Sequence, residues 1–311
     1  LLISVTGSCQ PVLVKIFPVK ILRKIKGMMI QTSSRNKFTV QRKAFTPQLY
    51  KDGINLIGDI KCDIGLGQSC RLLAFILQPD IPFTIYHYRQ ISAMKESDTS
   101  WDRKITNTTP YNINLVHINP YELFIAYQMI DKEIWNGRYN IAFWLWELEE
   151  FPEEWCVCFN LFDEIWTPSE FVSNSIRKKT TLPVFTMPYA LSVPVNEIYD
   201  RKYFHLPRGI FLVLIMYDCN SNTDRKNPMD SIRAYKKAFS SQDTSVGLVI
   251  KINNPQEKDI LMIKETLPEY KNIHFVTNIL SKVEVNSLIQ CSDVFISLHR
   301  SEGFGLVLAE S

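Results

Sequence analysis

Two carboxylates flank a glycine-containing turn near the last residue of the chain. Glu302 precedes the turn Gly303-Phe304-Gly305, and Glu310 follows it in a helix-forming stretch. The run Asp293–Leu298 before them is short, apolar and β-branched, which predicts a parallel strand buried on both faces. Ligands of open α/β sheets bind beyond the carboxyl ends of such strands, and carboxylates accept hydrogen bonds from paired hydroxyls. The spacing predicts a site for phosphate and sugar hydroxyls; the alternative is ordinary helix charges beside a turn.

A second pair of glycines follows the first predicted strand. Gly65 and Gly67 follow the strand at 54–57 and lie at the start of a predicted helix at 66–77. Glycines in such a place let a phosphate approach the N-terminus of the helix. The segment approximates the dinucleotide fingerprint G-x-G-x-x-G, but Cys70 occupies the position of the third glycine. The pair therefore indicates either a ligand loop or a structural tight turn.

Two further motifs lie at predicted strand ends. His117 and Asn119 close the strand at 113–117, where a lone histidine is more often a structural hydrogen-bonding group than a catalyst. Arg225 and Lys226 follow the strand at 209–216 and enter a helix. Cations in that place can neutralise a diphosphate and stabilise a leaving nucleotide, although most Arg-Lys pairs are simply solvated.

Composition narrows the class of protein. The chain has 311 residues, 46% of them hydrophobic, which is enough for two domains with substantial cores. The net charge of +3, without interleaved aromatic and basic residues, argues against nucleic acid as a partner. Seven scattered cysteines without a C-x-x-C pair indicate reduced thiols in a cytoplasmic protein. No apolar run is long enough to span a bilayer, whereas the basic segment Val12–Ile30 could lie on an anionic membrane surface or form a solvated linker.

The alternation of apolar and amphipathic runs predicts an α/β fold with two Rossmann-like domains facing a cleft. We divide the chain into a basic extension or linker at 1–50, a first domain at 51–205 and a second domain at 206–311, with Pro188–Pro207 as the interdomain linker. Strands are predicted at 54–57, 83–86, 113–117, 139–143, 164–166 and 184–187, then at 209–216, 246–252, 273–276 and 293–298. Helices are predicted at 66–77, 120–130, 153–159 and 169–179, then at 227–239, 256–267 and 282–290.

The pattern E-G-F-G-x-x-x-x-E after a predicted buried strand resembles the E-x7-E signature of retaining glycosyltransferases of the GT-B fold, family 4. The segment from Asn55 to Arg71 looks like the opening loop of their bacterial members, and the string W-x-W-E-x-x-x-x-P at Trp144–Pro152 resembles one subgroup. This resemblance implies a second domain that is incomplete at its C-terminal end.

The resemblance also implies a role for each candidate residue. It assigns the donor sugar to Glu302 and the backbone of Gly303, Phe304 and Gly305, the ribose diol to Glu310, the neighbourhood of the donor phosphates to Gly65 and Gly67, and the transferring sugar to His117 or Asn119. Lys226 matches the family's lysine on the diphosphate. The family's other basic residue normally lies several residues earlier, where this chain has Tyr217-Asp218-Cys219, and we assign its role to Arg225. Because the chain contains no D-x-D tripeptide, we expect a metal-independent donor site without a cofactor.

The expected activity is transfer of a sugar from a nucleotide-diphosphate sugar to a glycan or lipid-linked acceptor, as in bacterial surface polysaccharide assembly. The expected place is the cytoplasm, including the inner face of the membrane. One alternative is a non-catalytic module that binds a sugar nucleotide or glycan. A weaker alternative is an NAD-dependent dehydrogenase that uses the Gly65 loop, which Cys70 disfavours.

Overall fold

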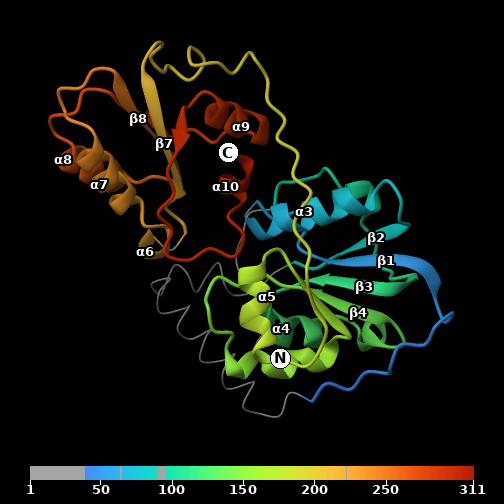
Figure 1. The fold of residues 1–311 in the computed structure, drawn as a ribbon. Helices are drawn as coiled ribbons and strands as arrows, with labels where there is room; N and C mark the ends of the chain where they lie inside the picture. The colour runs from blue at the N-terminus through green and yellow to red at the C-terminus, as the bar shows by residue number, and fades with distance from the viewer. Residues whose placement is uncertain (1–38, 64, 90–95, 222) are drawn as a thin grey trace, which may run out of the picture. The chain divides into compact units, whose positions relative to one another are not determined.

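The computed structural model describes residues 39–63, 65–89, 96–221 and 223–311. The chain forms two compact units, Leu1–Ala190 and Leu191–Ser311, each shown in Figure 1. The division falls inside the predicted linker Pro188–Pro207, ahead of the boundary predicted at residue 206. The predicted membrane-surface segment Val12–Ile30 lies outside the described residues.

Residues after Ala190 belong to the second unit because their polar groups bind it. The backbone N–H of Asn196 donates to Ser287 Oγ at 3.1 Å. The Arg201 guanidinium donates to Asp293 Oδ2 at 2.8 Å and to the carbonyl of Cys291 at 2.8 Å. A segment held by such bonds is part of the domain that supplies them, so little of the proline-containing stretch is a free linker.

The first unit contains a six-stranded sheet in the order β2-β1-β3-β4-β5-β6, and every neighbouring pair is parallel. The strands are β1 Lys51–Gly58, β2 Phe83–His87, β3 Tyr111–His117, β4 Tyr139–Phe143, β5 Glu164–Thr167 and β6 Val184–Thr186. The α-helices are α3 Gly65–Leu77, α4 Pro120–Met129 and α5 Glu170–Arg177, and the 3₁₀ helices are η1 Asp102–Lys104, η2 Lys132–Trp135 and η3 Glu153–Leu161. All six strands predicted for this half are confirmed.

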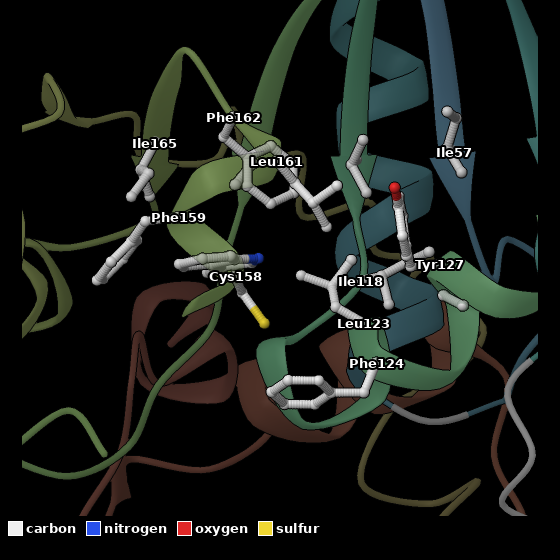
Figure 2. Packing of buried hydrophobic residues seen from close by; sticks show 14 of the residues in the cluster. Ile57, Ile118, Leu123, Phe124, Tyr127, Cys158, Phe159, Leu161, Phe162 and Ile165 are labelled. Carbon is white, nitrogen blue, oxygen red and sulfur yellow. The ribbon is translucent and has the colours of Figure 1, made fainter. Parts of the chain in front are cut away.

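Helices cover both faces of this sheet. Apolar residues of α4, α5 and η3 pack together with Ile57, Val116 and Ile165 of the strands, and α3 lies on the opposite face (Figure 1). Figure 2 shows this packing, with Phe159 and Leu161 of η3 and Leu123 and Phe124 of α4 among the labelled residues of the cluster. The α-helix predicted at 153–159 is instead 3₁₀ in form. Cys158 is buried in this core, as expected of a packed thiol, and the six cysteines in the described ranges are all free thiols.

Three buried asparagines cross the centre of the first sheet. Asn55, Asn114 and Asn140 lie opposite one another on β1, β3 and β4. Asn55 Nδ2 donates to Asn114 Oδ1 at 2.9 Å, and Asn114 Nδ2 donates to Asn140 Oδ1 at 2.7 Å. Each amide nitrogen also donates to a backbone carbonyl: Asn55 to that of Tyr111, Asn114 to that of Ile134 and Asn140 to that of Trp135. These side chains are fully buried, and their hydrogen bonds offset the cost of removing amides from water.

The second unit contains a four-stranded parallel sheet in the order β10-β7-β8-β9. Its strands are β7 Phe211–Asp218, β8 Val246–Asn253, β9 Ile273–Val276 and β10 Val294–Phe295. Its helices are α6 Thr223–Lys226, α7 Pro228–Ala238, α8 Glu257–Thr266, α9 Lys282–Gln290 and α10 Leu306–Glu310. Residues of α7 and α8 pack on one face of the sheet, and residues of α9 pack on the other with Phe204 and Leu206.

The strand predicted at 293–298 differs from the prediction. Only Val294 and Phe295 form β10, which lies at the edge of the four-stranded sheet and pairs with β7. Val294 and Leu298 are 39% and 42% exposed, so the prediction of a strand buried on both faces was wrong. A run of apolar residues indicates a strand without showing whether helices cover both of its faces. Within the described residues, no helix has the length and apolar character needed to cross a bilayer.

Candidate functional site

Glu302 lies in an ionic cluster beyond the carboxyl ends of β7 and β10. Its Oε2 atom is 2.7 Å from Lys226 Nζ, 3.4 Å from Arg225 Nη1 and 3.1 Å from His299 Nδ1. The Glu302 side chain is 25% exposed, and those of Lys226 and Arg225 are 19% and 20% exposed. The structure therefore brings together the cation pair and the first carboxylate that the sequence placed 76 residues apart.

The cluster keeps Glu302 ionised. Burial raises the pKa of this carboxyl, but hydrogen bonds from His299 and Lys226 and the charges of Lys226 and Arg225 outweigh burial and lower the pKa to about 2. A permanently charged carboxylate accepts hydrogen bonds without donating any. At neutral pH the group can accept from hydroxyls but cannot supply a proton.

Backbone contacts fix the loop that carries Glu302 against the segment that carries the cations. The N–H of Arg300 donates to the carbonyl of Arg225 at 2.9 Å, and the Asn227 amide donates to the carbonyl of Leu298 at 3.0 Å. Arg225 Nη1 also donates to the carbonyl of Ser301 at 3.1 Å. The two segments are thus joined by main-chain as well as side-chain contacts, which positions the charges in advance of any ligand.

The turn after Glu302 requires one of its glycines. Gly305 has φ +77°, in the left-handed region, and precedes α10. Gly303 is buried and Phe304 is half-buried. Glu310, the last residue of α10, is 8% exposed and forms an ion pair with Lys282 at the start of α9. Sequence reasoning missed Lys282, because a lysine that begins a helix has no pattern to distinguish it from a solvated one.

His117 lies at the carboxyl end of β3 in a neutral hydrogen-bonded cluster. Its Nε2 is 2.6 Å from Ser69 Oγ, and Ser69 Oγ also contacts the Tyr189 hydroxyl. The imidazole stacks on Phe143 with ring centroids 5.6 Å apart. Burial lowers the pKa of His117 to about 4, so the ring is uncharged at neutral pH. Neither Ser69 nor Tyr189 was predicted as a partner of His117. Ser69 lies within the segment Asn55–Arg71, but 48 residues before this strand end, and Tyr189 lies 72 residues after it.

Asn119 has a different role from His117. It occupies the N-cap position of α4, but its side chain makes no capping bond. Its Oδ1 instead accepts a hydrogen bond from the backbone N–H of Leu145 at 3.0 Å, in the segment after β4. Asn119 therefore connects two neighbouring strand ends of the first sheet.

The two glycines of the first loop have different surroundings. A Cβ added to Gly67 would lie 2.0 Å from the carbonyl oxygen of Cys62, so the close approach at this glycine is made by the protein's own backbone. A Cβ at Gly65 would meet nothing within 4 Å. Gly67 thus serves the tight turn, and Gly65 begins α3 on an exposed surface. Trp144, the first residue of the W-x-W-E string, is fully buried against Phe151 and Phe159, so packing in the core explains this tryptophan.

We compared the chain with known proteins. No family model matches it, and no curated protein matches it. Solved structures with a similar fold include the lipopolysaccharide outer core galactosyltransferase WaaB, at 12% identity and a TM-score of 0.53, covering 83% of this chain and 77% of that chain. Another is a UDP-forming alpha,alpha-trehalose-phosphate synthase from Burkholderia vietnamiensis, at 10% identity and a TM-score of 0.52, covering 84% and 80%.

A third is the E. coli structure described as trehalose-6-phosphate bound with UDP-2-fluoro glucose, at 8% identity and a TM-score of 0.51, covering 83% and 80%. At such low identity these similarities show the fold alone. The chain has the GT-B fold, in which two Rossmann-like α/β domains follow one another.

Proposed function

We propose that this chain is a retaining glycosyltransferase that moves a sugar, of the hexose type, from a nucleotide-diphosphate sugar to an acceptor hydroxyl. The observation that carries the proposal is the cluster of Glu302 with Lys226 and Arg225 at the strand ends of the second unit. The resemblance of the E-x7-E stretch to family 4 supports it. Further support comes from the fold, which the chain shares with a protein named as a galactosyltransferase and with a structure bound to a UDP-sugar analogue.

The charges of the cluster suit cleavage of a bond to a diphosphate. When the sugar leaves, negative charge develops on the phosphate oxygen, and preorganised cations stabilise that charge most effectively. Lys226 and Arg225 are held in place by Glu302 before a donor arrives. In our proposal the diphosphate takes over their N–H groups, which contributes the main catalytic effect without a metal ion.

Glu302 itself would hold the donor sugar. All three of its contacts to Lys226, Arg225 and His299 use Oε2, which leaves Oε1 outside this cluster. Together with the backbone of Gly303-Phe304-Gly305, an ionised Oε1 would accept hydrogen bonds from sugar hydroxyls. Glu310 would bind the ribose diol by sharing or displacing Lys282.

We assign the acceptor to the first unit and the donor to the second. In the first unit, neutral His117 would act as a hydrogen-bonding group and not as an acid, and Asn119 would help to keep the adjoining strand ends in position. Gly65 leaves space for a phosphate to approach the start of α3. The acceptor we propose is a glycan or lipid-linked sugar of surface polysaccharide assembly, in the cytoplasm or at the inner face of the membrane.

Nucleotide release tests the proposal. The chain is incubated with a panel of UDP-, GDP- and ADP-sugars, with and without a chelator, and free nucleotide is measured. Lys226→Ala should reduce release by about 10²- to 10³-fold, as expected when a charge-stabilising group is lost. Glu302→Gln should reduce it similarly, because the amide loses the charge that positions Lys226. The matched controls Lys237→Ala and Glu265→Gln, on exposed faces of α7 and α8, should retain full activity.

Two results would contradict the proposal. Hydride transfer with NAD and no nucleotide release would indicate a dehydrogenase. Tight donor binding without turnover across a range of glycan and lipid-linked acceptors would indicate a non-catalytic binding module. The stereochemistry of the product, measured by NMR on the new anomeric centre, distinguishes retention from inversion.

A further inference from the structure

We propose that Asp59, His87 and Glu96, in the first unit, form a binding site for a divalent transition-metal ion such as Zn²⁺. Each offers one ligand atom, and these atoms lie within 4.8 Å of one another. The site is separate from the Glu302 cluster of the second unit, and the inference does not depend on the proposed transferase activity. Sequence reasoning missed the group because its members are 28 and 9 residues apart and match no ligand-spacing pattern.

The sheet places two of the three residues side by side. β1 and β2 are parallel neighbours in which Gly58 pairs with His87, and Asp59 is the residue that follows Gly58. The backbone N–H of Tyr88 donates to the carbonyl of Gly58 at 3.0 Å and continues the pairing to this point. Asp59 and His87 therefore lie at the carboxyl edge of the sheet, at the ends of two adjacent hydrogen-bonded strands.

Glu96 reaches the same place through a separate segment. It forms an isolated antiparallel bridge with Cys62, in the loop after β1. The next two residues hold this arrangement: the Ser97 hydroxyl donates to Asp63 Oδ1 at 2.6 Å, and the Asp98 N–H donates to the carbonyl of Lys61 at 3.3 Å. Bonds to residues on either side of Cys62 thus hold the segment that carries Glu96. A metal ligand must be held in this way in order to be preorganised.

The distances suit a tetrahedral ion. Bonds of about 2.0–2.2 Å to nitrogen and oxygen ligands at the tetrahedral angle separate two ligand atoms by about 3.4 Å. His87 Nε2 and Glu96 Oε1 are 3.3 Å apart. The ligand atom that Asp59 offers lies within 4.8 Å of the other two, so its carboxylate would move toward the ion to complete the set of ligands.

Burial and charge make a cation the natural occupant. Asp59 is 3% exposed, and the side chains of His87 and Glu96 are each 18% exposed. His87 Nδ1 and Glu96 Oε1 are buried atoms with no hydrogen-bond partner in the described part of the chain. Two carboxylates at this separation repel one another, and Arg89, whose Nε is 3.6 Å from Glu96 Oε2, is mainly exposed. A divalent ion bound to His87 Nε2 would neutralise both carboxylates.

Metal binding to the whole purified chain tests this. After removal of metals with a chelator, Zn²⁺ alone is added and bound metal is counted by equilibrium dialysis, with Mn²⁺ in a parallel arm. We expect one ion per chain, with the affinity falling by more than about 100-fold in His87→Asn and Glu96→Gln, beyond the cost typical of losing an outer-shell partner. The matched control His205→Asn changes an exposed histidine whose φ of +54° suits asparagine, and it should bind normally.

A second measurement distinguishes a variant that has lost metal binding from one that folds poorly. Zn²⁺ should raise the melting temperature of the wild-type chain, followed by tryptophan fluorescence, and should leave Glu96→Gln unchanged. The absence of stoichiometric binding to the folded chain would overturn the proposal. Equal binding by the wild type and both variants would also overturn it, because the ion would then lie elsewhere.

Discussion

Different interactions hold the polar side chains at the strand ends of the two units. In the first unit, Ser69 and His117 form a buried, uncharged hydrogen-bonded cluster beside the tight turn at Gly67. In the second unit, Glu302 and Lys226 form a partly exposed ionic cluster. Side chains at the carboxyl edge of a parallel sheet can therefore be held in position for a ligand either by packing and neutral hydrogen bonds or by ion pairs. Changes in volume should harm the first region, and changes in charge should harm the second.

The largest effect should come from a methyl group at Gly67. Gly67→Ala places Cβ against the carbonyl of Cys62, and we expect a loss of about 3 kcal/mol in the free energy of unfolding. Gly65→Ala, two residues away, has open space and should be neutral or stabilising by less than about 1 kcal/mol. Urea unfolding followed by tryptophan fluorescence measures this, since all six tryptophans lie in the first unit. Similar stabilities for the two variants would show that packing does not control this turn.

A smaller effect should follow from removal of one buried hydroxyl. Ser69→Ala takes away the partner of His117 Nε2, and we expect a loss of about 2 kcal/mol. Ser175 provides the matched control: it is also buried, but its Oγ has no hydrogen-bond partner among the described residues. Ser175→Ala should therefore be neutral or stabilising in the same fluorescence experiment. If both variants lost equal stability, the cavity and not the hydrogen bond would be the cause.

The smallest effect separates the two regions by pH. The folded-state pKa of His117, about 4, lies below its ordinary value of 6.5, so its contribution is present above pH 6.5 and is lost as pH falls toward 4. The contribution of Glu302, with a pKa of about 2, is present above pH 4.5 and is lost as pH falls toward 2.

Between pH 7 and pH 5 the first unit should therefore lose on the order of 1 kcal/mol, while the Glu302 cluster changes little. Hydrogen exchange resolved by peptide measures each unit separately. His117→Asn should flatten the dependence in the first unit, and Glu302→Gln should not. A simultaneous loss in both units over this range would contradict the assignment.

Local patterns in the sequence predicted most of the elements. The bounds of β4, β9 and α9 agree with the prediction to the residue, because each is a short periodic run between turn-forming residues. Ser169, the first residue of the helix predicted at 169–179, caps α5 with its hydroxyl, which accepts from the N–H of Val172 at 3.4 Å. The predictions that differ, the buried strand at 293–298 and the α-helix at 153–159, both depend on tertiary packing.

Only part of the candidate site could be predicted from the sequence. Motifs placed Glu302, Arg225 and Lys226 at strand ends. Because a parallel sheet brings its strand ends to one edge, the proximity of these three side chains could be expected. The partners that determine the chemistry could not be predicted in this way. Tyr189 contacts Ser69 across 120 residues, and Lys282 binds Glu310 from the start of another helix. Such contacts follow from the final packing, not from any local spacing.

The row of asparagines in the first sheet has a consequence for how the chain reaches this structure. An apolar strand that slips by two residues keeps the same face buried and loses little. Asn55, Asn114 and Asn140 remove that freedom, because a slip of any one strand would leave buried amides without partners. The row therefore favours one register of β1, β3 and β4, and the strand ends that carry Asp59 and His117 lie at the same level of the sheet.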